Sequence, residues 1–384
     1  MSSQPAGRRR RARGATALLV VLVAVLTGCS AQPDRPVTTP VNTAVGADAS
    51  RSRAAELQAG LTHLLVERVQ VTATARAAVA EADRVEAAAA LDDSSAALAD
   101  LLGATFTGAR GQLLAVLRSC DRRGLRQADA VRTGSPDDVA TALADLQTGQ
   151  ADLAATVRRV VPRMPAEQIR ARLDGDLAAQ LAVQGDAAFA QLRAASGRAP
   201  ATAALLTAGI AADRGLGPVG TRAATLRAAL TGLLTEHVQL AGAMARLPGD
   251  ARTTGAAVAA LQANGADLTA LLGQAYPDLP SGFGPMWAGH VERLVGLAAD
   301  PSAEQRRRVL AFPNELGNEL ARHVVGLSAR TTGSEFTPLL SALAAAVEGG
   351  DSPGAHAALR RASAAVPAPS ALVAAAIAQD RRYT

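Results

Sequence analysis

The chain has no lysine, only two cysteines and few aromatic residues, which make up 2% of its 384 residues. After residue 50, strand-forming residues do not alternate with polar ones, and Ala and Leu instead recur at helical spacing. This pattern argues against a β-sheet protein and favours helices throughout. Stretches rich in Gly, Pro or Asp divide the sequence into segments of the length expected for bundle helices. The predicted breaks are Gly134–Pro136, Pro162–Pro165, Gly197–Pro200, Gly215–Gly220, Pro248–Asp250, Pro277–Gly282, Asp300–Ser302, Arg330–Gly333 and Gly349–Gly354. We therefore predict an all-α fold.

Motifs that carry catalytic chemistry are also missing. The sequence has no Gly-x-Ser-x-Gly elbow, no phosphate-binding loop, no dinucleotide fingerprint and no paired-cysteine metal motif. No arrangement of Ser, His and Asp suggests a serine triad. The sequence therefore predicts that the protein is not an enzyme.

The N-terminus carries the features of an exported lipoprotein. Five arginines among the first 13 residues precede an apolar run over 17–26, which is too short to span a membrane comfortably. The run is followed by Gly and Cys29, and Leu-Thr-Gly-Cys resembles a bacterial lipobox. An ordinary signal peptide with an incidental cysteine is the alternative. We predict that residues 1–28 are a lipoprotein signal peptide and that membrane lipid attached to Cys29 holds the protein at the outer face of the cytoplasmic membrane.

Removal of the signal peptide changes the charge of the chain. That segment has five arginines and no acidic residue, so the formal net charge falls from +5 to zero. The remaining arginines are interspersed with Asp and Glu, whereas binding to a phosphate backbone needs a basic stripe. We therefore expect no nucleic acid partner.

Residues 29–52 are rich in Pro, Thr, Ser and Asp, and we predict that they form a flexible, disordered linker. Beyond this linker the sequence repeats itself, with three blocks in the same order at similar separations. The blocks are LQAGLTHLLVERVQV from Leu57 and LRAALTGLLTEHVQL from Leu226, LDDSSAALADLLGATF from Leu91 and LQANGADLTALLGQAY from Leu261, and LRAASGRAPATAALLTAGIA from Leu192 and LRRASAAVPAPSALVAAAIA from Leu359. We predict two tandem helical bundles resembling four-helix bundles, over 53–214 and 222–381.

Four polar side chains of the second copy fall on apolar helix faces. Each histidine of this set follows large apolar residues by three and seven positions, and the asparagine stands between two leucines. We predict that all four point into the bundle. The residues are His237, Asn264, His290 and His323. By contrast, His63 and His356 stand beside charged and polar residues, which predicts a solvated surface for both.

The blocks LLTEHVQLA, FGPMWAGH and LARHV, together with the segment 261–276, resemble an uncharacterised family of secreted or lipid-anchored helical proteins of Gram-positive bacteria. The resemblance covers nearly the whole second copy. It implies that the same three histidines and Asn264 occupy the family's characteristic polar positions. The family has no established activity that the resemblance would transfer.

Two interpretations of this polar cluster remain open. In the first, the imidazoles and the amide partner one another and fix which helices are neighbours. In the second, His237, His290 and His323, with Glu236, bind zinc or copper, for which imidazole is a natural ligand. The first copy has Arg68 in place of His237 and Cys120 in place of His290, so it lacks these ligands.

Cys120 has no disulfide partner if Cys29 carries lipid. It is either a small buried apolar residue or a free thiol, and we favour the first because no base stands near it in the sequence. As a whole, the sequence predicts a non-catalytic interaction or scaffold module of the cell envelope, with an envelope protein as partner. A zinc- or copper-binding lipoprotein is the alternative.

Overall fold

The computed structural model describes residues 47–246, 251–350, 352 and 354–383. Within these residues the chain is helical and contains no β-strand, which confirms the predicted all-α bundle fold. The predicted signal peptide and Cys29 lie outside the described residues.

A short helix, α1 (Ala47–Ser50), precedes two series of helices of matching order. The first series is α2 (Arg53–Ala77), α3 (Glu81–Thr105), α4 (Arg110–Thr133), α5 (Pro136–Val160), α6 (Ala166–Leu181), α7 (Ala188–Ser196) and α8 (Ala199–Arg214). The second series is α9 (Arg222–Ala245), α10 (Ala251–Gly273), α11 (Pro280–Ala299), α12 (Ala303–His323), α13 (Ala329–Gly349), α14 (Ala355–Ala364) and α15 (Pro367–Arg381). We call α2–α8 the first half and α9–α15 the second half. A 3₁₀ turn, η1 (Gly185–Ala187), precedes α7.

Capping groups fix several helix ends. At the start of α5, the Ser135 hydroxyl accepts the Asp138 N–H (3.2 Å) and the Asp138 carboxylate accepts the Ser135 N–H (3.0 Å), which forms a capping box. Gly215 caps the end of α8, and its φ of 64° is the left-handed conformation that glycine adopts without a Cβ clash. Both ends coincide with Gly and Pro breaks predicted from the sequence.

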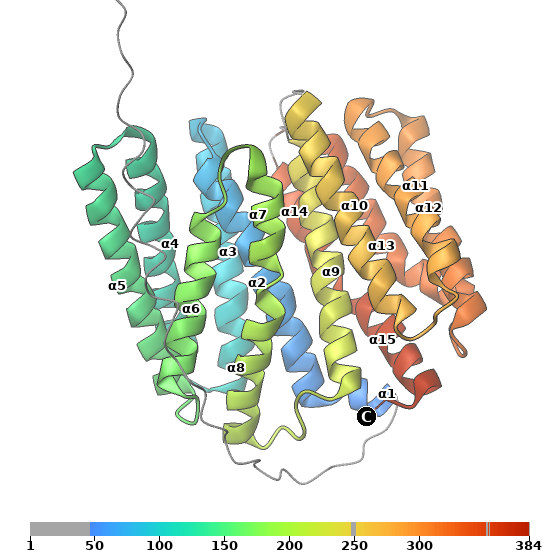
Figure 1. Ribbon diagram of the computed structural model, residues 1–384, viewed down its shortest axis with the longest axis horizontal. Helices are drawn as coiled ribbons and strands as arrows, with labels where there is room; N and C mark the ends of the chain where they lie inside the picture. Colours follow the sequence, from blue (N-terminus) through green and yellow to red (C-terminus); the bar gives the residue numbers. More distant parts are fainter. Residues whose placement is uncertain (1–46, 247–250, 351, 353, 384) are drawn as a thin grey trace, which may run out of the picture. The chain divides into compact units, whose positions relative to one another are not determined.

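The two halves pack against each other through their first helices, α2 and α9, which run side by side near the middle of the molecule (Figure 1). Both helices are buried on most of their surface, as expected of helices surrounded by others. Gly232 allows their close approach, because a Cβ there would lie 3.0 Å from the Thr62 methyl group. The predicted boundaries of the two copies, 53–214 and 222–381, stay predictions. The main apolar cluster of the second half includes Val69, Leu192 and Ala195 of the first half, which otherwise has apolar clusters of its own.

Ion pairs that cross between the halves follow the same repeat. Arg193 on α7 pairs with Glu236 on α9 (Nε to Oε2, 3.6 Å) and with Asp267 on α10. In the opposite direction, Arg360 on α14 pairs with Glu67 on α2 (Nε to Oε1, 3.6 Å). The two arginines occupy equivalent repeat positions, and so do the two glutamates. Each half therefore supplies an arginine that neutralises a buried carboxylate of the other half.

Three expectations about boundaries and exposure are corrected. The linker was expected to run to residue 52, but residues 47–50 form α1, and the Ser50 carbonyl accepts a hydrogen bond from Arg227 (2.8 Å). Arg330–Gly333 was expected to break a helix but lies inside α13. His63, expected at a solvated surface, is buried between α2 and α9, where its Nδ1 lies 2.8 Å from the Thr235 hydroxyl.

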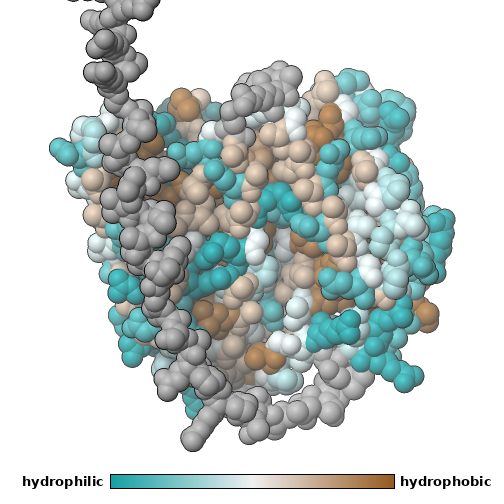
Figure 2. Space-filling view, in the orientation of Figure 1, coloured by the Kyte–Doolittle hydropathy of each residue, from teal (hydrophilic) through white to brown (hydrophobic). Residues whose placement is uncertain are grey.

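Hydrophilic side chains gather at the edge of the molecule where α11 and α12 lie (Figure 2). Within the described residues one stretch, His356–Arg381, is long and apolar enough to cross a membrane, with a mean hydropathy of 1.4. This stretch covers most of α14 and all of α15. In its most apolar window of 18 residues, 56% of the residues are buried within the fold. Residues of this stretch therefore form part of the apolar core of the second half.

Candidate functional site

Three of the four polar residues singled out in the second half are buried together. His237 on α9 is 3% exposed, and Asn264 on α10 and His290 on α11 are completely buried. The centroids of the two imidazole rings lie 5.3 Å apart. The helical spacing therefore identified the inward face of these three helices correctly.

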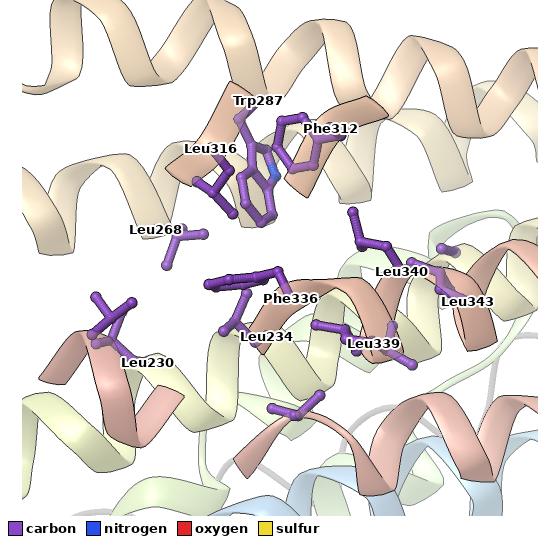
Figure 3. Packing of buried hydrophobic residues seen from close by; sticks show 14 of the residues in the cluster. Leu230, Leu234, Leu268, Trp287, Phe312, Leu316, Phe336, Leu339, Leu340 and Leu343 are labelled. Atoms are coloured by element: carbon purple, nitrogen blue, oxygen red, sulfur yellow. The ribbon is translucent and has the colours of Figure 1, made fainter. Parts of the chain in front are cut away.

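Aromatic rings surround the two imidazoles. The Trp287 ring lies edge-on to His237 (5.0 Å between centroids) and to His290 (5.6 Å). The His290 ring stacks on Phe312 of α12, with centroids 4.0 Å apart and planes inclined by 9°. Figure 3 shows the Trp287 indole pointing from α11 into the core, near Leu316 and Phe312. The site is thus enclosed by carbon-rich faces.

Among the described residues, the ring nitrogens of His290 and the Trp287 indole N–H are buried without a hydrogen-bond partner, and the ring nitrogens of His237 make no well-formed hydrogen bond. Burial lowers the pKa of His237 to about 4, although its side-chain interaction with Asn264 opposes this shift. Burial also lowers the pKa of His290 well below the ordinary value, with a smaller contribution from His237. Both rings are therefore neutral at neutral pH.

Glu236 faces away from this pair. Its carboxylate accepts a hydrogen bond from the Asn264 amide (Nδ2 to Oε2, 2.8 Å) and pairs with Arg193. Burial raises the pKa of Glu236, while the hydrogen bond from Asn264 opposes this shift. Glu236 thus belongs to the contact between the halves, because its neighbour Arg193 comes from the first half.

His323 does not join the other histidines. It is the last residue of α12, its side chain is 25% exposed, and its Nε2 lies 3.5 Å from the Glu319 carboxylate one turn earlier. In the part of the chain that the structure describes, no group of three or more His, Cys, Asp or Glu side chains is placed to hold a metal ion. The structure therefore does not assemble the metal-binding set of His237, His290, His323 and Glu236 expected from the sequence.

The equivalent region of the first half contains a cavity. Repeat positions pair Leu117 with Trp287 and Cys120 with His290. Counting back twelve residues from Val161 and Val324, which directly follow α5 and α12, pairs Gly149 with Phe312. The contacts agree, because the Cys120 thiol donates to the Gly149 carbonyl (3.2 Å) just as His290 stacks on Phe312. Smaller side chains thus replace three rings.

The consequence of these replacements is a large difference in free volume. The first half contains a partly open cavity of about 130 Å³, whereas the equivalent space in the second half is about 20 Å³. Equivalent residues line both spaces. They include Leu98, Leu102, Leu113, Leu117 and Leu153 in the first half, and Leu268, Leu272, Phe283, Trp287 and Leu316 in the second.

Polar groups line one part of the first-half cavity. Arg68, in the place of His237, pairs with Asp121 and donates to the Ser95 hydroxyl (2.6 Å), which in turn donates to Asp121 (2.6 Å). Gln150 also lines the cavity, and its buried Oε1 has no hydrogen-bond partner. The cavity therefore combines leucine walls with an ion pair and one free acceptor.

Cys120 lies in the cavity wall and is buried. Burial raises the pKa of its thiol to about 11, so the thiolate that would act as nucleophile is scarce at neutral pH. This agrees with the interpretation of Cys120 as a small buried residue. The cavity itself was missed from the sequence, although the replacement of Trp287 by Leu117 was the signal that could have revealed it.

Comparison with protein families, curated proteins and solved structures found no match to this chain. The resemblance to a family of helical envelope proteins therefore stays a prediction.

Proposed function

We propose that the protein is a non-catalytic binding module of the cell envelope whose first half takes up a small apolar ligand. The cavity beside Leu117 and Cys120 carries this proposal. Side chains that line unfilled space lose packing contacts, and the first half keeps a partly open cavity of about 130 Å³ among its leucines. In the second half, the equivalent helices fill this region with the rings of Trp287, His290 and Phe312.

The shape and lining of the cavity restrict the ligand. A volume of about 130 Å³ is close to that of engineered apolar cavities of about 150 Å³, which bind benzene. The leucine walls favour an apolar body of this size. The unpartnered Gln150 Oε1 would accept a hydrogen bond from one N–H or O–H of the ligand. The proposed ligand class is thus a small ring or branched hydrocarbon with one donor group.

The location is part of the proposal. Lipid on Cys29 would tether the module to the outer face of the cytoplasmic membrane, and the N-terminal sequence supports this placement. The high pKa of the Cys120 thiol supports a role in binding over one in covalent catalysis. An envelope protein that exchanges ligand with the module stays the predicted partner.

Thermal unfolding with benzene or indole as probes tests the proposal. A ligand at ten times its Kd stabilises the folded state by about 1.4 kcal/mol, so the wild-type Tm should rise with probe concentration. The Leu117→Trp variant, which places the ring of the second half in the cavity, should lose this rise. Leu117→Phe is the milder variant if the larger ring prevents folding.

Val131→Trp is the matched control, because Val131 is an exposed residue on the same helix, α4. It adds the same ring without filling the cavity and should respond to probes as the wild type does. Equal Tm shifts in Leu117→Trp and Val131→Trp, or no shift in the wild type, would contradict the proposal.

A further inference from the structure

We propose that the ligand of the first-half cavity is a small apolar carboxylate, whose carboxylate binds the guanidinium of Arg76 while its apolar body lies among the leucines. This inference rests on the proposed function, because it adds a charge to the ligand that the same cavity takes up. An unpaired cation in the cavity lining carries it.

The charged side chains of the cavity lining are paired with one exception. Among the described residues, four charged side chains line the cavity. Arg68 pairs with Asp121, and Asp176 pairs with Arg198, which lies outside the lining (Oδ1 to Nε, 2.8 Å). Arg76 on α2 has no Asp or Glu of the described chain within ion-pair distance. The lining therefore carries one positive charge that the fold does not neutralise.

The surroundings of Arg76 favour an anion beside it. Its half-buried side chain donates a long hydrogen bond to the Gly124 carbonyl of α4 (Nη1 to O, 3.4 Å). A second cation, Arg132, donates to the Arg76 carbonyl (2.6 Å) and is itself paired with Asp129. Burial and Arg132 both lower the pKa of Arg76, although an arginine stays charged at neutral pH. Because burying a charge is costly unless it is paired, an anionic group on the ligand would be stabilised here.

The second half shows that the fold does not need a cation at this position. When the ungapped repeat that aligns Leu57 with Leu226 is continued, Arg76 aligns with Ala245, and both residues lie in the last turn of their helices. A basic residue can stabilise the end of a helix, but α9 ends without one in its last turn. The arginine thus occurs in the half that has the cavity and is replaced in the half whose core is filled.

The two polar groups that would hold the ligand lie about one helical turn apart along the cavity. The Cys120 thiol donates to the carbonyl of Gly149, the neighbour of Gln150, and Arg76 donates to the carbonyl of Gly124. Gly124 follows Cys120 by four residues on α4, a rise of about 6 Å. A single ring with a short carboxylate arm spans this distance, so one ligand can reach both Arg76 and the Gln150 acceptor.

The charge of the site selects a carboxylate over a phosphate. A guanidinium matches the geometry of both groups and can bind either through two parallel hydrogen bonds. A phosphate monoester carries nearly two negative charges at neutral pH, whereas the lining has one unpaired cation. A carboxylate carries one charge, so it neutralises Arg76 without burying a further negative charge among the leucines.

Calorimetric titration with a matched pair of probes, indole and indole-3-acetate, tests this inference. The two share the ring and its N–H, but only indole-3-acetate has a carboxylate. All samples are the full chain with Cys29→Ala, so that no lipid offers the probes another apolar phase. A hydrogen bond between charged groups changes an affinity by about tenfold or more, so the wild-type cavity should bind indole-3-acetate at least about tenfold more tightly than indole.

The decisive variant is Arg76→Met, which removes the charge and keeps an unbranched side chain. It should still bind indole but lose the preference for indole-3-acetate, and Arg76→Gln serves if the methionine variant loses helical circular dichroism. Arg53→Met is the matched control, because Arg53 is an exposed arginine on the same helix, and it should keep the preference.

The outcomes separate this inference from the proposed function. Equal affinities for the two probes in the wild type, or a preference that persists in Arg76→Met or disappears in Arg53→Met, would overturn the role of Arg76 while indole binding still supports the cavity. A wild type that binds neither probe would contradict both.

Discussion

Acid should destabilise the protein because the two buried imidazoles, His237 and His290, stay neutral in the folded state. Burial lowers the pKa of His237 from 6.5 to about 4 and shifts that of His290 in the same direction. As the pH falls below 6.5, the unfolded chain binds protons that the folded chain does not. The free energy of unfolding therefore decreases. The stability contributed by the neutral rings is fully present above pH 6.5 and is lost as the pH falls toward 4.

The magnitude follows from the shift of His237. One pKa unit corresponds to about 1.36 kcal/mol, so a change from pH 7 to pH 5 removes about 2 kcal/mol through His237 alone. His290 adds to this loss. Urea unfolding followed by circular dichroism at both pH values measures the difference.

The double variant His237→Leu/His290→Leu should lose this pH dependence. Its stability difference between pH 7 and pH 5 should be smaller than that of the wild type by about 2 kcal/mol or more. His323→Leu retains both buried rings and should keep their contribution. If the double variant and the wild type lose the same free energy of unfolding between the two pH values, the reasoning is refuted.

Three further predictions concern packing, the contact between the halves and the anchor. Trp287→Leu should open a cavity in the second half, lower the free energy of unfolding by about 2–4 kcal/mol and create a second binding site for benzene, as calorimetric titration would show. Arg193→Met leaves the buried Glu236 carboxylate without its cationic partner, so denaturant unfolding should show a loss of about 1–3 kcal/mol, against less than about 1 kcal/mol for Arg84→Met in an exposed pair. Cys29→Ala should move the protein from the membrane fraction to the soluble fraction, and an unchanged distribution would argue against lipidation.

Much of the fold could be predicted from the sequence because strong breakers coincide with real helix ends. The Gly215–Gly220 stretch separates α8 from α9, and the prolines at 162 and 165 lie between α5 and α6. One predicted break was wrong, because Arg330–Gly333 lies inside α13. Pro285 and Pro313 also lie inside helices, where the surrounding packing outweighs one lost backbone hydrogen bond.

The candidate site could be predicted only for residues whose burial depends on the face of a single helix. His237 and His290 lie in the middle of long helices, so the spacing of nearby leucines and rings gives their direction correctly. For His323 the same spacing, from Leu316 and Leu320, was misleading because His323 is the last residue of α12, where its side chain is 25% exposed. Spacing along a single helix also says nothing about which side chains of neighbouring helices meet.

The cavity depends on contacts between helices whose sequences have diverged. α5 and α12 share no block that would align Gly149 with Phe312 without their helix ends. The absence of three rings at one point therefore becomes visible only when the helices are placed together. A cavity of this kind depends on how the helices pack together, whereas the position of each helix depends mainly on its own sequence.

The most direct test of the difference between the halves is a crystal structure of the protein under xenon pressure, because xenon enters dry apolar cavities. The account predicts xenon beside Leu117 and Leu153 in the first half and none between Trp287 and Leu316 in the second. Xenon at equal occupancy in both halves, or none in the first half, would contradict it.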